Sequence, residues 1–358
     1  MTFYDAMQLG ANVLKPLIKE TNDKNLKRKY ITALIVKSFL CLIFCIVFIS
    51  IFSMIFGKEN SIVGVVTVIL LLTFRFSNLD FKVGQSAFVI MGIFIIFAVS
   101  PYLATMVNPI LGMIINIISI IVILILSCHN TILSNQSTVV LSYILLYGYK
   151  IDSIDVYKTR VVALIFGGII VSAIFYFKQR KIEFENTLLD VLKDIDINSE
   201  RTKWQLKLAL GISTGILIGE LLHIPRTMWI GFSCMSTLHH NKENINFRFK
   251  NRPIYMILGC VIFAAIYAIT PEAVKGYVSL IGGIMVGFSA TYQWQTVFNC
   301  FGALSTAIPI FGLQWAIIIR IFDNVFGAIY SKLFDKFFDK IFSKYENAVT
   351  NKQLNEVS

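Results

Sequence analysis

Apolar and polar positions alternate along this chain in long blocks, with apolar runs separated by short polar or charged stretches. A helix that crosses a bilayer needs about 20 apolar residues, and several of the runs have this length. The second and fifth runs of each half are shorter or carry polar residues. The runs cover residues 32–56, 61–74, 84–104, 106–128, 136–148, 160–177, 206–223, 228–238, 253–270, 274–290, 294–310 and 312–331.

Three basic or amphipathic segments frame these runs. Apolar residues at helical spacing between 188 and 195 predict an amphipathic cytoplasmic helix in the charged linker between two halves. The predicted organisation is an N-terminal amphipathic segment, two membrane blocks joined by the linker, and a basic amphipathic tail. Their boundaries are 1–31, 32–177, 178–205, 206–331 and 332–358.

Composition supports a membrane protein. Of 358 residues, 56% are hydrophobic and 15% are charged, whereas a water-soluble domain has about a quarter charged residues. The net charge of +11 comes mostly from basic residues beside apolar runs, which is a pattern of membrane topology. We therefore expect a polytopic all-α protein whose partner is the lipid bilayer and not nucleic acid.

The distribution of Lys and Arg predicts the topology. If all twelve runs cross, most basic residues fall on one side, in segments 1–31, 75–83, 178–205, 240–252 and the tail. The positive-inside rule then favours twelve transmembrane helices in the cell membrane, with both termini cytoplasmic. Lys150, Lys158 and Arg160 are exceptions that lie outside in this arrangement.

The two halves resemble each other. A shift of 160 residues places Arg160 on Arg320 and Gly167 on Gly327, and a shift near 170 places Lys82 on Arg252. An even number of crossings in each block makes the copies parallel. The expected fold is therefore two parallel six-helix repeats, with amphipathic cytoplasmic segments leading into them.

No motif indicates an enzyme, a cofactor or a metal site. The six cysteines are scattered without the spacing of a zinc site, and we expect them to be buried thiols. His239 and His240 are adjacent, so on a helix they would diverge by about 100°, which suits chelation poorly. The chain also has no nucleophile elbow, P-loop or HExxH pattern.

The second block carries a more specific pattern. Trp229 heads a short run, a basic loop follows, and Arg252 precedes an apolar run containing Gly259. With the Arg160–Gly167 and Arg320–Gly327 pairs, this pattern resembles the FUSC superfamily of integral membrane transporters, the fusaric-acid-resistance and aromatic-acid-exporter-like proteins. The resemblance implies export of small organic, often aromatic, acids. The chain departs from the family in having Pro253–Ile254 after the Arg and in lacking a large cytoplasmic domain.

Charged groups inside the membrane are the first site candidates, since a charge in hydrocarbon is costly unless it is paired or solvated. Arg320 has Asp323 three residues later on the same helical face, a spacing that allows an ion pair. Arg320 either coordinates an anionic substrate or braces the helix as one member of a permanent pair. Arg160 recurs at the matching position, but Ala163 replaces the aspartate there.

Other candidates lie at run ends and in the short runs. Glu220 and Arg226 form either a gate at the outer mouth or an interfacial pair. Short segments at corresponding places of two halves point to a transport site. In them, Trp229 and Trp294 are candidates for stacking on an aromatic ring, or are interfacial anchors, and Asn299 is a candidate for orienting the ring.

Arg252 closes the inner loop that starts at Lys242, and this loop is either a topology signal or a cytoplasmic entrance. Taken together, the sequence predicts a secondary transporter that exports small organic anions, including aromatic ones. The alternative is a non-transporting membrane scaffold or partner subunit in envelope or lipid assembly, with the buried charges as braces. Both readings leave homo-oligomers open.

Overall fold

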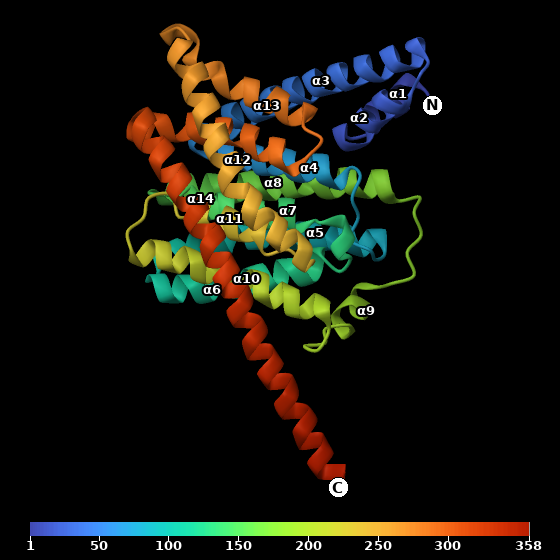
Figure 1. The fold of residues 1–358 in the computed structure, drawn as a ribbon, viewed down its shortest axis with the longest axis vertical. Helices are drawn as coiled ribbons and strands as arrows, with labels where there is room; N and C mark the ends of the chain where they lie inside the picture. Colours follow the sequence, from blue (N-terminus) through green and yellow to red (C-terminus); the bar gives the residue numbers. More distant parts are fainter. Residues whose placement is uncertain (358) are drawn as a thin grey trace. The chain divides into compact units, whose positions relative to one another are not determined.

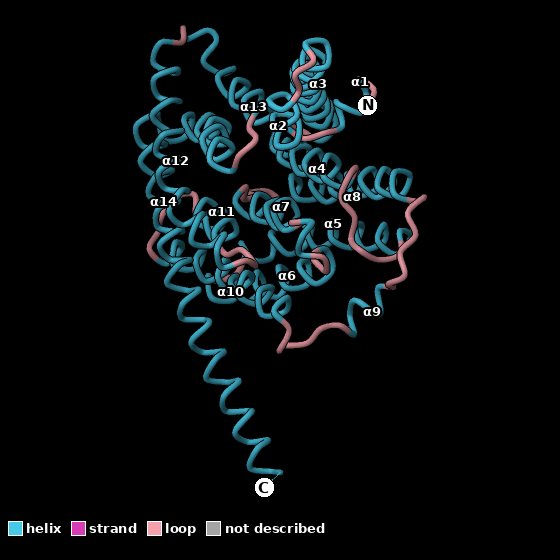
Figure 2. The backbone as a smooth tube through the Cα atoms, turned by 45° about the vertical axis from the view of Figure 1, so that its right-hand side comes forward, coloured by secondary structure: helices cyan, strands magenta, loops and turns pink. Residues whose placement is uncertain are grey.

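The computed structural model describes the backbone of residues 1–357 and the side chains of residues 1–343. Within that part of the chain all regular structure is helical (Figure 2). Ser358, the last residue of the predicted tail 332–358, lies outside the described residues. The rest of that tail continues the last helix.

Each predicted apolar run lies largely within one helix, and the last two runs share one helix. Helices α3, α8, α10 and α12 begin six to eleven residues before their runs, and the last helix extends beyond residue 331. The helices are α3 (Lys24–Phe56), α4 (Ser61–Phe74), α5 (Val83–Met106), α6 (Pro109–Ser127), α7 (Gln136–Gly148), α8 (Ile154–Gln179), α10 (Glu200–Leu221), α11 (Met228–Thr237), α12 (Lys242–Ile269), α13 (Val278–Phe288) and α14 (Tyr292–Val357). Helix α14 is interrupted at Gly312, whose φ of 74° breaks the helical path between the two runs.

Among the described residues, six helices are long and apolar enough to cross a membrane. They are α3, α5, α6, α8, α12 and the portion Tyr292–Ser343 of α14. Helices α4, α7, α11 and α13 are 10 to 14 residues long, too short to cross a bilayer that is not thinned around them. The chain is therefore a multi-pass membrane protein.

The chain folds into two compact units, and each unit is assembled from two separate stretches. Unit 1 consists of residues 1–54 and 250–324, and unit 2 of residues 55–249 and the chain from Val325 onward. Helices α3, α12 and α14 each continue from one unit into the other.

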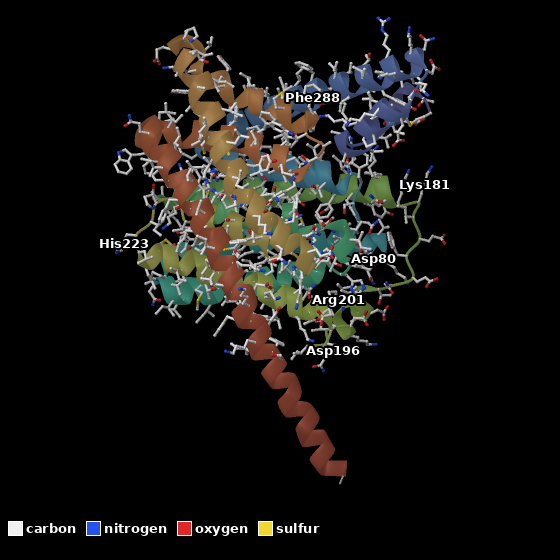
Figure 3. All side chains as sticks on the ribbon, in the orientation of Figure 1. Asp80, Lys181, Asp196, Arg201, His223 and Phe288 are labelled. Carbon is white, nitrogen blue, oxygen red and sulfur yellow. The ribbon has the colours of Figure 1, made fainter. Side chains whose placement is uncertain are left out.

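In unit 1 the N-terminal segment folds back on α3 (Figure 1). Helices α1 (Phe3–Gln8) and α2 (Ala11–Glu20) bury Ala6 and Leu14 against Tyr30, Ala33 and Leu34 of α3, with Phe288 from the end of α13 beside them (Figure 3). The Lys37 ammonium donates to the backbone carbonyl of Leu9 at 2.7 Å. The predicted amphipathic segment is thus a packed part of this unit.

In unit 2 two glycines allow close helix packing. A Cβ on Gly167 of α8 would lie 2.4 Å from Oγ1 of Thr67 on α4. One on Gly327 of α14 would lie 2.6 Å from Cβ of Ser233 on α11. Either contact excludes a side chain without a local shift.

The linker between α8 and α10 contains a helix where the apolar spacing predicted one. This helix, α9 (Leu188–Lys193), is only six residues long. The chain then turns, with the Asp196 side chain accepting from the backbone of Asn198, and Ser199 caps the start of α10. The linker is therefore mostly turn and loop.

Candidate functional site

Four polar side chains are buried together in unit 1, where α12 faces the middle of α14. The exposed fraction is 7% for Arg252, 4% for Arg320 and 0% for both Asp323 and Asn324. Polar groups are buried at a cost unless they are bonded, and charges cost most, so a cluster of this kind inside a membrane helix pair is a candidate site. We refer to these four residues as the arginine cluster.

Two hydrogen bonds to α14 hold the Arg252 guanidinium. Its Nη2 donates to Oδ1 of Asn324 at 3.0 Å, and its Nη1 donates to the Tyr292 hydroxyl at 3.4 Å. Asn324 presents its oxygen to Arg252 because its own amide nitrogen donates to the backbone carbonyl of Arg320 at 2.8 Å, one turn earlier. The amide orientation is therefore fixed by the helix that carries it.

Gly259 explains how α12 comes close enough for these bonds. A Cβ at Gly259 would lie 2.5 Å from the backbone oxygen of Val297 and 2.9 Å from Sγ of Cys300, both on α14. Seven residues are about two helical turns, so Arg252 and Gly259 lie on the same face of α12. In the sequence pattern, Arg252 thus bonds to α14, and Gly259 lets α12 come close to α14 because it has no side chain.

Asp323 is the unusual member of the cluster. Both carboxylate oxygens are buried, and within the described part of the chain neither accepts a hydrogen bond. Arg320 interacts electrostatically with Asp323 and with Arg252, but the ion pair that the i, i+3 spacing allows is not closed by a hydrogen bond. Two arginines and one aspartate leave a formal charge of +1, which favours an added anion.

Arg160, the counterpart of Arg320 in the first half, has a different environment in unit 2. Its Nε donates to Oδ1 of Asn60 at 3.0 Å, and its Nη1 and Nη2 donate to the backbone oxygens of Tyr149 and Glu59. All three nitrogens are thus used to hold the turn before α4 and the loop before α8. Arg160 therefore connects these two segments to α8.

The remaining sequence candidates are not part of the arginine cluster. Trp229, on α11 of unit 2, is 1% exposed, so its ring faces are covered by protein. Trp294, on α14 of unit 1, is 47% exposed and stacks on Phe298. Asn299, on the same helix, is exposed.

Glu220 and Arg226 both contact tyrosines near the end of α7. The Glu220 carboxylate accepts a hydrogen bond from the Tyr147 hydroxyl, and the Arg226 guanidinium lies 5.6 Å from the centre of the Tyr149 ring. Both residues belong to unit 2, and these contacts tie the end of α10 and the loop after it to the region of α7.

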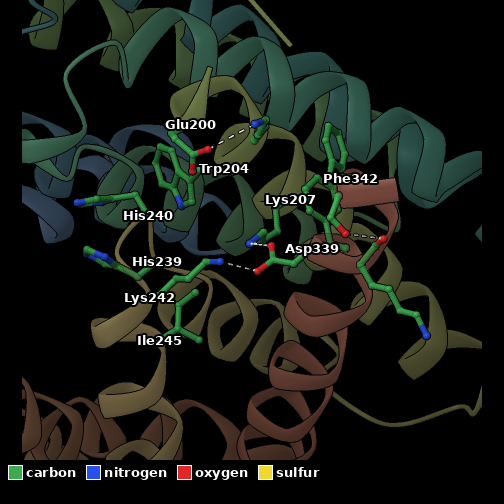
Figure 4. Close-up of a pocket in the computed structure, with 13 residues that line it drawn as sticks. Glu200, Trp204, Lys207, His239, His240, Lys242, Ile245, Asp339 and Phe342 are labelled. Carbon is green, nitrogen blue, oxygen red and sulfur yellow. Dashed lines mark hydrogen bonds and ion pairs between the residues drawn. The ribbon is translucent and has the colours of Figure 1, made fainter. Parts of the chain in front are cut away.

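Unit 2 contains a pocket that the sequence did not predict, with a volume of about 530 Å³ (Figure 4). It lies between the start of α10, the start of α12 and the C-terminal half of α14. At its base Lys207 donates to Asp335 and to Asp339, each at 2.7 Å. The available signal was Lys207 itself, a lysine inside an apolar run, but its aspartates lie 128 and 132 residues later.

His239 lies at the edge of this pocket and is kept neutral. Burial, followed by the charges of Arg248 and His240, lowers the pKa of His239 to about 3. Its Nδ1 accepts a hydrogen bond from the backbone nitrogen of Asn241 at 3.1 Å, which requires the unprotonated nitrogen. The histidine pair therefore adds no positive charge to the pocket near neutral pH.

Comparison with known families agrees with the sequence pattern. Residues 213–334 match the family model described as fusaric acid resistance protein-like. The matched range includes Trp229, Arg252, Gly259, Arg320 and Gly327. No curated protein and no solved structure matches the chain.

Proposed function

Because residues 213–334 form a fusaric acid resistance protein-like domain, we propose that this chain is a secondary transporter that exports small organic anions, aromatic carboxylates among them. The substrate carboxylate binds between Arg252 and Arg320. The observation that carries the proposal is the arginine cluster. In it Arg320 interacts with a second buried arginine and with Asp323, whose carboxylate accepts no hydrogen bond within the described residues.

The charges of the cluster explain how it would bind and release an anion. A carboxylate that reaches the arginines forms charge-assisted hydrogen bonds, which are among the strongest in proteins. Asp323 is the resident counter-ion, so the site without substrate is not left with two uncompensated charges. When the substrate leaves, Asp323 again balances Arg320. In this way the resident carboxylate keeps binding reversible.

For the architecture we propose twelve crossings in two parallel six-helix repeats, with both termini on the cytoplasmic side. The close pairs Gly167–Thr67 and Gly327–Ser233 support the repeats, because each joins the last helix of a half to the short second helix of the same half. The positive-inside pattern supports the orientation.

The repeats differ at their arginines, and this suggests a single substrate site. Arg160 donates to a side-chain amide and two backbone carbonyls, whereas Arg320 lies beside a second arginine and an aspartate. We assign substrate binding to the second half and a structural role to Arg160.

Transport into proteoliposomes tests the proposal. Purified protein is reconstituted, and uptake of radiolabelled fusaric acid, benzoate and hexanoate is measured for the unaltered chain and for Arg252→Gln and Arg320→Gln. Each variant leaves the other arginine and Asp323 in place, and we expect transport to fall more than about tenfold, since disrupting a buried charge network costs a few kcal/mol. Arg28→Gln, an exposed arginine of α3 in the same unit, is the matched control and transports normally.

The result also separates the two functional readings. If the unaltered protein moves none of the acids while remaining folded, the transporter is rejected in favour of the membrane scaffold. If both arginine variants transport normally, the substrate site lies elsewhere.

A further inference from the structure

The pocket of unit 2 contains the elements of a second ligand site, separate from the arginine cluster. Asp339 lies between two lysines: its Oδ1 accepts from Lys207 at 2.7 Å, and its Oδ2 lies 3.0 Å from Nζ of Lys242. Each oxygen of one carboxylate thus meets its own ammonium group. The two lysines are arranged around a carboxylate, and in this structure the protein supplies it.

The Asp339 carboxylate can move away from the two lysines without leaving the buried Lys207 ammonium unpaired. Lys207 keeps Asp335 as its second partner at 2.7 Å, and this pair is buried. The Asp339 side chain is 37% exposed and that of Lys242 is 74% exposed, so both reach water. Replacing Asp339 by another carboxylate therefore costs little desolvation, whereas removing Lys207 would take away the nearest cation of the buried Asp335.

The rest of the lining favours an aromatic anion. The Trp204 ring is fixed by a hydrogen bond from its Nε1 to the Leu238 carbonyl, and His240 meets it edge-on. Phe338 and Phe342, one turn apart on α14, stack on each other with ring centres 4.5 Å apart. Trp204 and Phe338 are only 4% and 6% exposed, so a ligand ring meets mainly Phe342 and His240. Offset or edge contacts between rings stabilise beyond the apolar area that they bury.

The net charge and the volume of the pocket further restrict the class of ligand that it can bind. The pocket is lined by four lysines and two carboxylates, with neutral histidines, and the buried Asp335 that pairs with Lys207 adds a third carboxylate, so the excess is one positive charge. A volume of about 530 Å³ is within the range of small-molecule sites and exceeds what one ring fills. We propose that this pocket binds a two-ring aromatic carboxylate, whose carboxylate takes the place of Asp339 between Lys207 and Lys242.

Two variants with opposite expected effects test this inference. Binding of 2-naphthoate to the full-length protein in detergent is measured by calorimetry, with 2-naphthamide as the uncharged probe. Asp339→Asn removes the competing carboxylate, and we expect affinity to rise about two- to fivefold; Lys242→Gln removes one cation, and we expect a fall of about the same factor, as for partly exposed ion pairs. Both changes are isosteric or polar replacements of partly exposed groups, so folding is retained.

The controls locate the binding site. Lys336→Gln removes an exposed lysine of α14 that does not line the pocket, and it leaves the affinity unchanged. Arg320→Gln removes only the binding that belongs to the arginine cluster, and the binding event that responds to Asp339→Asn and Lys242→Gln remains, which separates this site from the transport site. The inference is overturned if the unaltered protein does not bind 2-naphthoate, if Asp339→Asn weakens binding, or if Arg320→Gln abolishes it. Equal binding of the amide would show that the lysines do not recognise the ligand.

Discussion

Arg252 on α12 donates a hydrogen bond from Nη2 to Oδ1 of Asn324 on α14, although 72 residues separate them in the chain. This bond joins the two helices at the point where both carry buried charge. Because the Asn324 amide is fixed by the Arg320 carbonyl, the positions of Arg252 and Arg320 are linked through one side chain. Substitutions here should therefore change binding and helix packing in separable ways.

Asp323→Asn is expected to lower both KM and kcat for carboxylate transport. The change keeps the shape of the side chain but raises the formal charge of the arginine cluster from +1 to +2, since two arginines then have no aspartate. Anion binding strengthens and release slows, so KM falls severalfold with a parallel loss of kcat. Initial rates over a range of substrate concentration in proteoliposomes measure this. A raised KM would contradict Asp323 as the resident counter-ion.

Arg160→Gln is expected to reduce stability rather than transport. The variant loses charge-assisted hydrogen bonds to Asn60 and to the carbonyls of Glu59 and Tyr149, at a cost of about 3 kcal/mol or more. Transport per folded molecule should equal that of the unaltered chain. Thermal unfolding in detergent, with transport normalised to folded protein, separates the two effects. A transport defect at full stability would place Arg160 at a substrate site instead.

Gly327→Ala is expected to destabilise the protein by about 1–3 kcal/mol, because the added methyl group would meet the backbone oxygen of Ile230 at 2.9 Å as well as the Ser233 side chain. Gly302→Ala, in the same helix, is the matched control. Nothing lies within 4 Å of its added Cβ, so the helix gains up to about 1 kcal/mol from the better helix former. Unfolding temperatures of the two variants should move in opposite directions.

Acidification should weaken the fold through His239. Its pKa is lowered to about 3 in the folded chain from 6.5, so the unfolded chain takes up a proton at higher pH than the folded one. Its contribution to stability is therefore complete above pH 6.5 and declines as the pH falls toward 3, by at most about 1.4 kcal/mol per pH unit.

His239→Asn tests this linkage because it supplies an oxygen near the position of Nδ1 but does not titrate. Unfolding temperatures between pH 7.5 and 5 should fall less steeply for the variant than for the unaltered chain. Identical slopes would show that other groups cause the pH dependence.

The helices could be predicted closely from the sequence, because runs of apolar residues specify membrane helices locally. The ends of α4, α5 and α7 agree with the runs at 61–74, 84–104 and 136–148 to within two residues. The family pattern around Trp229, Arg252 and Gly259 was also recognisable, and it lies in the matched range 213–334.

Contacts between residues that lie far apart in the sequence could not be predicted in this way. Arg252 was interpreted as part of an inner loop, but α12 begins ten residues earlier and buries it against Asn324. Lys207 lies in an apolar run, and nothing local shows that Asp335 and Asp339 of the tail come to it. The hydrophobic pattern gives the apolar portion of a helix, whereas these contacts depend on which faces of distant helices meet.

Each unit consists of two separate stretches of the chain, and this determines which fragments of the protein contain a complete unit. The matched range 213–334 takes in α13 but not residues 1–54, whose Ser38 lies against Gly287 and whose Tyr30 cluster packs with Phe288. It also takes in Gly327 and Ser233 of unit 2 but not α4 to α9. The range that matches the family model is thus different from either set of residues that forms one compact unit. A gene fragment cut at the boundaries of the matched range would encode part of each unit and all of neither.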